Sequence, residues 1–395
     1  ADVFFQGGVD HYNLAVQWGT KAFTAHNLGD TATELADLQS AKTEYGLARG
    51  VFDQLPASYP ASIRLDNAAY LAGRCSYEIG TIDQIAFDHS KLPADQAAAI
   101  ADFQDARTRL LAVQAAYPTS GFLHPVAYFL GRSRFHLAAE KPQPTPAYDT
   151  FAAARAEFVH ALALQPAGTF ADNAQYYVGR CWFEEGYHLV NVVPAPAVGS
   201  ADWLAAKADL QSAEVELGKV LTSFPTSTYV DNARYYLGKS WFEEPVDSVT
   251  SPAIRQANVE KAIGYFTAVV GTAGSPFAVG ARYWRGKAEY AHAFLTASGG
   301  VKNQADLAAA IADFGPIRPP ETFADHALYY LVKCYTHVDP GPVCLPATSV
   351  GPPPTTACGA LAALDALVAT NPLYAASTYP PLARTYATTN GCTCP

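Results

Sequence analysis

The sequence predicts an all-α solenoid of about seven helix-turn-helix repeats. One segment recurs seven times in the 395 residues, as in LDNAAYLAGRCSYEIG, ADNAQYYVGRCWFEEG and VDNARYYLGKSWFEE, and a degenerate copy, YPPLARTYATT, lies near the end. Apolar and aromatic residues recur within each copy at helical spacing. Self-similarity at a period of tens of residues is typical of stacked repeats. We therefore expect an array that binds or builds, and not an enzyme.

Each copy contains one small residue that we use as its anchor. The anchors are Ala15, Gly73, Gly131, Gly179, Gly238, Gly286, Val332 and Ala383. Neighbouring anchors are separated by between 46 residues (286 to 332) and 59 residues (179 to 238). Aspartate stands at the start of several copies, where it suits a helix N-cap. Each copy is therefore expected to form one helix, called helix A.

A second, alanine-rich amphipathic run lies between consecutive copies. Examples are AAAIADFQDARTRLLAVQAAY, FAAARAEFVHALAL and AAKADLQSAEVELGKVLTSF. Each run ends near a proline that begins the turn into the next copy, and we expect it to form helix B of a pair. The predicted repeats are 9–60, 66–118, 124–166, 172–225, 231–276, 279–319 and 325–372, followed by a lone C-terminal helix at 376–389.

Two blocks carry a resemblance to a known family. FPTSTYVDNARYYLGKSWFEE (224–244) and LQPAGTFADNAQYYVGRCWFEEG (164–186) resemble the tetratricopeptide repeat (TPR) family, in the variant found in bacterial cell-envelope proteins. The resemblance implies one right-handed, TPR-like solenoid over residues 1–395. A TPR unit has about 34 residues, so the longer period predicts long A-to-B inserts. We expect these at 137–147, 186–200, 244–253 and 338–357, of which 338–357 is rich in proline.

Tyrosine stands three residues before the anchor in all seven full copies. This tyrosine row consists of Tyr12, Tyr70, Tyr128, Tyr176, Tyr235, Tyr283 and Tyr329. A second aromatic row, four residues after the anchor, contains Tyr77, Phe135, Phe183, Phe242 and Tyr290. Tyrosine at a fixed repeat position often packs against the neighbouring repeat. That structural role and a role in partner binding are both open.

A basic residue follows the anchor directly in seven of the eight copies. This cation row consists of Arg74, Arg132, Arg180, Lys239, Lys287, Lys333 and Arg384. In the TPR family the tyrosine and cation rows would line the concave groove, and there they could hold an extended or carboxylate-bearing segment of a protein partner.

The alternative for the cation row is pairing within the chain. Glu78, Glu184 and Glu243 follow three of the cations by four residues, which suits ion pairs along one helix. Four cations have no acidic residue at that distance, and we predict these as the groove residues most open to an acidic partner. They are Arg132, Lys287, Lys333 and Arg384.

The seven cysteines form two sets. Three lie two residues after an anchor, where other copies carry Ser, Ala or Thr, and are predicted to be buried, unreactive thiols; they are Cys75, Cys181 and Cys334. The other four are candidates for disulfides, namely Cys344, Cys358, Cys392 and Cys394. A Cys344–Cys358 bond is the first choice because these two bracket a proline-rich loop, but the tail cysteines could pair with them or bridge to another molecule. A zinc site is a weaker alternative, since CxxC is missing.

Composition narrows the class of protein. Only 16% of residues are charged and the net charge is −10, which argues against nucleic acid as a partner. No apolar stretch is long enough to span a bilayer. No catalytic, cofactor-binding or metal-binding motif occurs, so no cofactor or small-molecule ligand is expected. The chain contains no Met and begins ADVFFQGG, which is consistent with a mature secreted, extracellular or periplasmic protein.

Both ends of the chain are poor in charge. From residue 341 to residue 395 the charged side chains are Asp365 and Arg384, and ADVFFQGG forms an apolar leader. The candidate assembly interface is Val3, Phe4, Phe5, Tyr374, Tyr379, Leu382 and Tyr386. Head-to-tail contacts make rings or filaments. We therefore predict a secreted, non-enzymatic protein that self-assembles into an extracellular filament or other structural assembly. The alternative is a periplasmic or cell-envelope adaptor that binds a partner's extended segment in the groove.

Overall fold

Helices make up most of the described chain. A computed structural model describes residues 1–139, 150–192, 194–247, 251–297, 301–319, 321–338, 355–371, 374–392 and 394. The chain divides into two compact units, Ala1–Glu184 and Glu185–Pro395. Within the described residues, no helix is long and apolar enough to cross a membrane.

The first unit begins with seven helices, the last of which crosses the boundary between the units. They are α1 (Asp2–Asn27), α2 (Thr31–Ser58), α3 (Leu65–Ser90), α4 (Pro93–Ala116), α5 (Leu123–Ala139), α6 (Phe151–Leu164) and α7 (Ala171–Val190). The second unit continues with α8 (Ala201–Ser223), α9 (Val230–Glu243), α10 (Pro252–Val270), α11 (Ala278–Leu295), α12 (Gln304–Phe314), α13 (Ala324–Tyr335), α14 (Ala357–Thr370) and α15 (Tyr379–Thr389). Odd-numbered helices are A helices and even-numbered ones are B helices.

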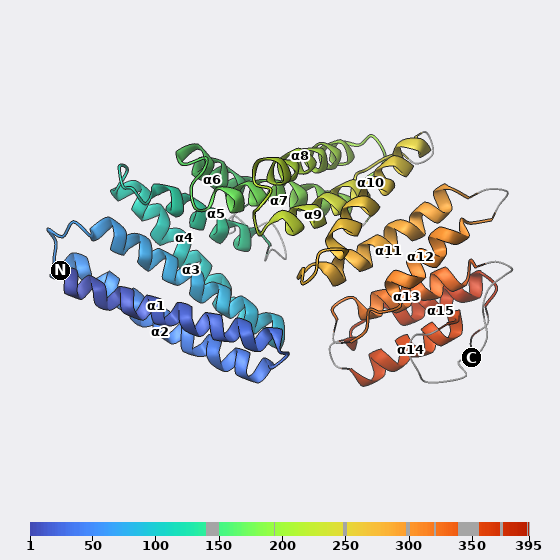
Figure 1. The fold of residues 1–395 in the computed structure, drawn as a ribbon, viewed down its shortest axis with the longest axis horizontal. Coiled ribbons are helices and arrows are strands. Elements are labelled where there is room, and N and C mark those ends of the chain that lie inside the picture. The colour runs from blue at the N-terminus through green and yellow to red at the C-terminus, as the bar shows by residue number, and fades with distance from the viewer. Residues whose placement is uncertain are drawn as a thin grey trace. The chain divides into compact units, whose positions relative to one another are not determined.

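Consecutive helices pack side by side within each unit (Figure 1). Helix A contacts the B helix that follows it in the pairs α1–α2, α3–α4, α5–α6, α9–α10, α11–α12 and α13–α14. The last helix, α15, is a lone A helix that packs on α13 and α14. The predicted all-α, TPR-like arrangement of helix pairs with a terminal lone helix is therefore confirmed.

The anchor glycines let helix A approach helix B closely. A Cβ atom placed on Gly131 would lie 2.8 Å from a ring carbon of Phe158, and one on Gly238 would lie 2.6 Å from Phe266. Gly286 has the same relation to Phe314 at 2.9 Å. These distances are below van der Waals contact, so each phenyl ring occupies the space that a larger anchor would need.

The first copy uses a different anchor from the one that the sequence suggested. Gly8, and not Ala15, faces Phe52 of α2, since a Cβ on Gly8 would lie 2.6 Å from that ring. Helix α1 begins at Asp2, so the segment DVFFQGG is the first part of this helix and not an extension ahead of it. Ala15 and Gly8 are seven residues apart and therefore lie on nearly the same helix face. With Gly8 as anchor, Tyr12 belongs to the second aromatic row.

Long helices account for the long period of the first two repeats. Helices α1 to α4 contain 26, 28, 26 and 24 residues. Later A-to-B connections are true inserts, such as the one between α9, which ends at Glu243, and α10, which begins at Pro252. Helix α7 continues to Val190, into the predicted insert 186–200. Most of the predicted inserts 137–147 and 338–357 lies outside the described residues.

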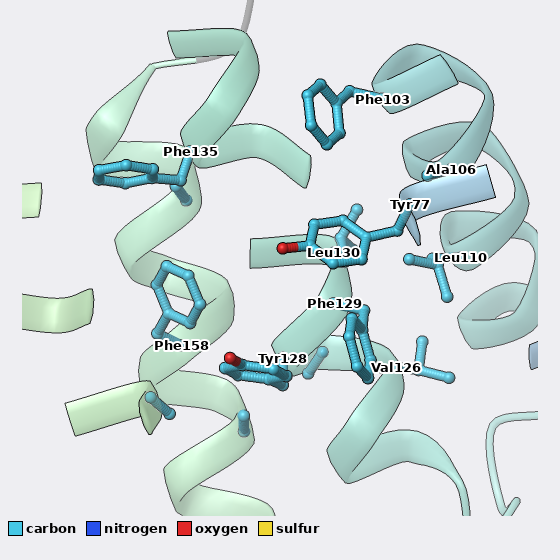
Figure 2. Close-up of a cluster of buried hydrophobic side chains, with 14 of the residues drawn as sticks. Tyr77, Phe103, Ala106, Leu110, Val126, Tyr128, Phe129, Leu130, Phe135 and Phe158 are labelled. Atoms are coloured by element: carbon cyan, nitrogen blue, oxygen red, sulfur yellow. The ribbon is translucent and has the colours of Figure 1, made fainter. Parts of the chain in front are cut away.

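Aromatic rings fill the core of the first unit. Tyr77 and Phe103 join α3 to α4, and Tyr128, Phe129 and Phe158 join α5 to its neighbours (Figure 2). All five are buried. The core is continuous from one pair of helices to the next, as expected for a repeat protein in which a single pair cannot bury its own apolar face.

Candidate functional site

The tyrosine row lies largely inside the packed helices. Six of its seven members are buried and Tyr329 is half-buried. Tyr128 stacks on Phe170 and Tyr283 stacks on Phe323, each with ring centroids 4.6 Å apart. The partner ring in each case lies in the turn just before the next A helix. The row thus packs each A helix against the following turn.

A third aromatic row was missed by the sequence analysis. It lies nine residues before the anchor and consists of Phe122, Phe170, Tyr229, Phe277, Phe323 and Tyr374. Phe122 stacks on Tyr70 at 5.5 Å, and Phe277 lies 5.1 Å from Tyr235. The equivalent of this row in the second copy is Arg64, which lies 5.6 Å over the ring of Phe5. Its fixed distance from the anchor was the signal that could have revealed it.

The tyrosine and cation rows are joined by hydrogen bonds along each helix. Arg132 Nη1 donates to Tyr128 Oη at 2.9 Å, and Arg180 Nη1 donates to Tyr176 Oη at 3.3 Å. The two members of each pair are four residues apart, so they lie on one face of helix A.

The cations also lie over rings of the neighbouring repeats. Arg132 is 5.3 Å from the Tyr77 ring of the preceding A helix and 4.4 Å from the Tyr177 ring of the following one. Arg74 has the same relation to Tyr12 at 5.2 Å and to Phe129 at 4.7 Å. Each such contact contributes about 0.5–2 kcal/mol, depending on desolvation. The cation row therefore links successive A helices.

The second unit repeats this arrangement. Lys333 lies 4.8 Å over Tyr290 of the preceding A helix and 5.2 Å over Tyr386 of α15. Lys239 and Lys287 lie 4.8 Å and 3.8 Å from the ring of Trp284. The four other tryptophans also have a cation within cation–π distance, in the pairs Trp18–Lys21, Trp182–Arg155, Trp203–Lys207 and Trp241–Lys261.

Carboxylates neutralise several members of the cation row. The predicted pairs on one helix are present for Arg74, 3.5 Å from Glu78, and for Arg180, 2.6 Å from Glu184. Lys287 and Arg384, which have no acidic residue four positions on, nevertheless each have one on another helix. Lys287 Nζ lies 4.0 Å from Glu243 Oε1, and Arg384 Nη2 donates to Asp365 Oδ2 at 2.7 Å.

Those acidic partners belong to other helices, which spacing along one helix cannot reveal. Glu243 lies on α9 and Lys287 on α11, while Asp365 lies on α14 and Arg384 on α15. Burial lowers the pKa of Lys287 to about 8, although Glu243 opposes the shift, and burial also lowers the pKa of Lys333. Burial lowers a lysine pKa because the charged form loses contact with water. The ammonium groups of Lys287 and Lys333 are therefore surrounded largely by protein atoms. The two rows act as an internal connection between repeats, and a role in holding a partner stays a prediction.

The thiols in the A helices are buried as predicted. Cys75 and Cys334 are free and Cys181 is fully buried. Burial raises the pKa of Cys75 to about 12 and raises that of Cys334. At neutral pH the thiolate, which is the reactive form, is therefore negligible at these two positions.

The disulfide differs from our first choice. Cys358 bonds to Cys394, with Cα atoms 5.2 Å apart, so a Cys344–Cys358 bond is wrong. Cys358 lies at the start of α14, and α15 returns the tail to that point, so the two cysteines meet although they are 36 residues apart in the sequence. Cys392 is also disulfide-bonded, and Cys344 lies outside the described residues. Because the sulfurs of Cys358 and Cys394 are joined, the four-cysteine zinc alternative fails.

Most of the candidate interface residues pack inside the chain. Phe5 is buried and lies 5.6 Å from Phe52, and Phe4 lies 5.6 Å from Tyr59. The aromatic residues of the tail contact α11, α13 and the turn before α13, since Tyr386 Oη lies 2.7 Å from Tyr290 Oη, Tyr379 lies 5.1 Å from Tyr329, and Tyr374 donates to the Glu321 carbonyl. Of the seven residues, Val3 is 89% exposed and Leu382 is 51% exposed. The other five pack against other residues of the chain. The reason is that the N-terminal segment is part of α1, and that α15 packs on α13 and α14 as an eighth A helix would.

No protein-family model matches the sequence, and no curated protein is significantly similar to it. The chain is similar to a solved structure of a monomeric mutant of IFIT1 with m7Gppp-AAAA, at 11% identity and a TM-score of 0.44, over 94% of this chain and 80% of that one.

Proposed function

We propose that this protein is a secreted, non-enzymatic scaffold that works through protein association, with its own copies as the main partner in an end-to-end extracellular assembly. The observation that carries the proposal is the set of exposed apolar side chains on α1. Phe23 is 66% exposed, and Val16, seven residues earlier and therefore on nearly the same face of α1, also faces solvent. Exposed apolar groups that gather on one element are typical of interaction surfaces.

The C-terminal helices offer a second exposed surface with few charged residues. The two charged side chains of α14 and α15, Asp365 and Arg384, neutralise each other. Leu382 and the alanines at 362, 366 and 369 are exposed beside them. A contact between two different surfaces of one chain is heterologous and can propagate from copy to copy. The Cys358–Cys394 bond supports an oxidising compartment, where disulfides persist.

Mass measured against concentration tests this proposal. We expect the full chain to form species larger than a monomer, and we expect Phe23→Lys and Leu382→Lys each to return it to a monomer in sedimentation velocity. Leu204→Lys is the matched control, because Leu204 is 54% exposed but lies on α8, which belongs to neither of the two surfaces. A wild-type chain that stays monomeric from nanomolar to high micromolar concentration would refute self-association.

The cell-envelope adaptor remains the second candidate. Its support is the partial exposure of Arg74, Arg132 and Lys333 in the cation row. In that case the wild-type chain would stay monomeric and a carboxylate-bearing partner would bind it, and Arg132→Glu would abolish the binding. Electron micrographs of native material separate the two candidates, because only the first forms assemblies of this chain alone.

A further inference from the structure

Three ionisable side chains from three successive helices meet in the first unit. Lys42 of α2 donates from Nζ to Oδ1 of Asp83 on α3 at 2.5 Å. Asp83 is 6% exposed, and its other oxygen, Oδ2, is buried without a hydrogen-bond partner among the described residues. A buried carboxylate oxygen without a donor costs free energy. The ion pair with Lys42 therefore leaves the Asp83 carboxylate only half satisfied.

Asp102 of α4 is a neighbouring carboxyl group that can supply this donor once it is protonated. Burial and the neighbouring Asp83 raise the pKa of Asp102 to about 6, against the opposing effect of Arg49 and Lys42. In its protonated form Asp102 can donate a hydrogen bond to Asp83. Arg49 lies 3.7 Å from Asp102 and closer, at 3.2 Å, to Asp105. The cluster thus combines an amine, a buried carboxyl group and a second carboxyl group able to carry a proton.

We propose that Lys42 and Asp83 condense into an amide bond within the folded protein, with Asp102 as the proton-transferring group. The Lys42 ammonium first gives one proton to the Asp83 carboxylate across their hydrogen bond. The amine lone pair then forms a C–N bond to Asp83 Cγ, while Asp102 stabilises the oxygen on which negative charge develops.

Water is the leaving group. Asp102 accepts a proton from the nitrogen and gives a proton to the departing hydroxyl as the C–O bond breaks. One water molecule leaves and Asp102 ends protonated, as it began. An ammonium and a carboxylate are therefore converted to an amide and water, with no oxidant, reductant or other co-reactant.

Two features of the surroundings serve this step. The fold holds amine and carboxyl group in contact, which replaces a bimolecular encounter by a reaction within one molecule. The Lys42 side chain is 32% exposed, which gives the released water a path out of the site. The resulting bond would join helix B of the first repeat to helix A of the second.

Two other ion pairs in the chain each lack one of the features that the Lys42–Asp83–Asp102 cluster combines. Arg285 and Asp313 form a buried pair beside Glu289, but a guanidinium is too weak a nucleophile to replace the lysine. Lys219 and Glu216 are 2.7 Å apart but lie on one exposed helix face. These pairs are expected to remain ionic.

Intact mass spectrometry of the full-length folded protein, measured after reduction of the disulfides, tests the proposal. We expect a mass below that of the sequence by one water, and a branched peptide joining the Lys42 and Asp83 fragments after digestion. A protein at its full sequence mass, with both fragments unlinked, would overturn it. Neither result depends on whether the chain associates with its own copies.

Four variants separate the roles of the three residues. Lys42→Arg keeps the positive charge and should stay at its own sequence mass, and Asp102→Asn should also stay there because the proton carrier is lost. Asp83→Asn should lose ammonia in place of water. Lys219→Arg is the control and should still lose one water. Circular dichroism confirms that each variant is folded, and full cross-linking in folded Asp102→Asn would refute the role of Asp102.

Discussion

His136 is a neutral side chain held in an apolar site. It is stacked on Phe103 with ring centroids 4.4 Å apart, and its Nε2 atom is buried with no partner among the described residues. Burial lowers the pKa of His136 to about 3, and Arg132 and Arg180 add to the shift. The folded first unit therefore resists taking up a proton that the unfolded chain accepts near pH 6.5.

This difference predicts acid sensitivity of the first unit. The folded pKa is the lower one, so the contribution of His136 to stability is present above pH 6.5 and is lost as pH falls toward 3, at about 1.4 kcal/mol per pH unit. We expect His136→Phe, which keeps the ring, to flatten this slope in urea unfolding between pH 4 and 7. His160→Gln, at an exposed position, should leave it unchanged, and an equal slope in His136→Phe would contradict the assignment.

Glu289 predicts the opposite dependence in the second unit. Burial and the neighbouring Asp313 raise the pKa of Glu289 to about 8. Its folded pKa is the higher one, so stability is fully present below about pH 4.5 and is lost as pH rises toward 8. Glu289→Gln should therefore unfold at a higher temperature than wild type at pH 9 and at nearly the same temperature at pH 4.5. A variant less stable than wild type at pH 9 would show that the carboxylate is stabilised.

The close contact between helices A and B gives a prediction at the scale of the element. Gly238→Ala would place a Cβ 2.6 Å from Phe266, which we expect to destabilise the second unit by about 1–3 kcal/mol through overpacking. Gly264→Ala in α10 is the matched control, because open space surrounds that position. There alanine should stabilise by up to about 1 kcal/mol through helix propensity. Denaturant unfolding measures both, and equal effects would exclude overpacking as the cause.

Sequence patterns predicted the helices well because each A helix carries its own anchor and each B helix its own alanine-rich face. They placed the first anchor seven residues late, since Ala15 and Gly8 lie two turns apart on one face and both follow an aromatic residue by three. They also placed the extra length of the repeats in the A-to-B connections. In the first two repeats that length lies in the helices instead, and the extra turns contain no strong helix-breaking residue apart from Pro56 at the end of α2.

Contacts between helices explain the other differences. Ion pairs along a helix were predictable from spacing, as for Arg180 and Glu184, but the partner of Lys287 comes from another repeat. The Cys358–Cys394 bond depends on how α15 folds back on α14, which no spacing rule contains. Ion pairs and disulfides between separate helices depend on how those helices pack. The sequence can reveal such contacts only where every repeat carries the same residues at the same positions.

Across each unit, the interleaved cations and rings predict cooperative unfolding. A repeat protein is held together by contacts between neighbouring repeats, and Arg132 contacts rings on the A helices before and after its own. Arg132→Gln should destabilise the first unit by about 1–3 kcal/mol and broaden its urea transition. Lys91→Gln, which removes an exposed cation, should do neither. A sharp and unshifted transition in Arg132→Gln would mean that these contacts contribute little.

The cations beside the tryptophans make the protein its own optical probe. All five indole rings lie near an ammonium or guanidinium group, from Arg155 at 3.3 Å from Trp182 to Lys207 at 5.5 Å from Trp203. A charge at such a distance changes the energy of the indole excited state, and unfolding removes it. Trp18 and Trp182 lie in the first unit and the other three in the second. Single-tryptophan variants would therefore show by emission wavelength which unit melts first, without any attached dye.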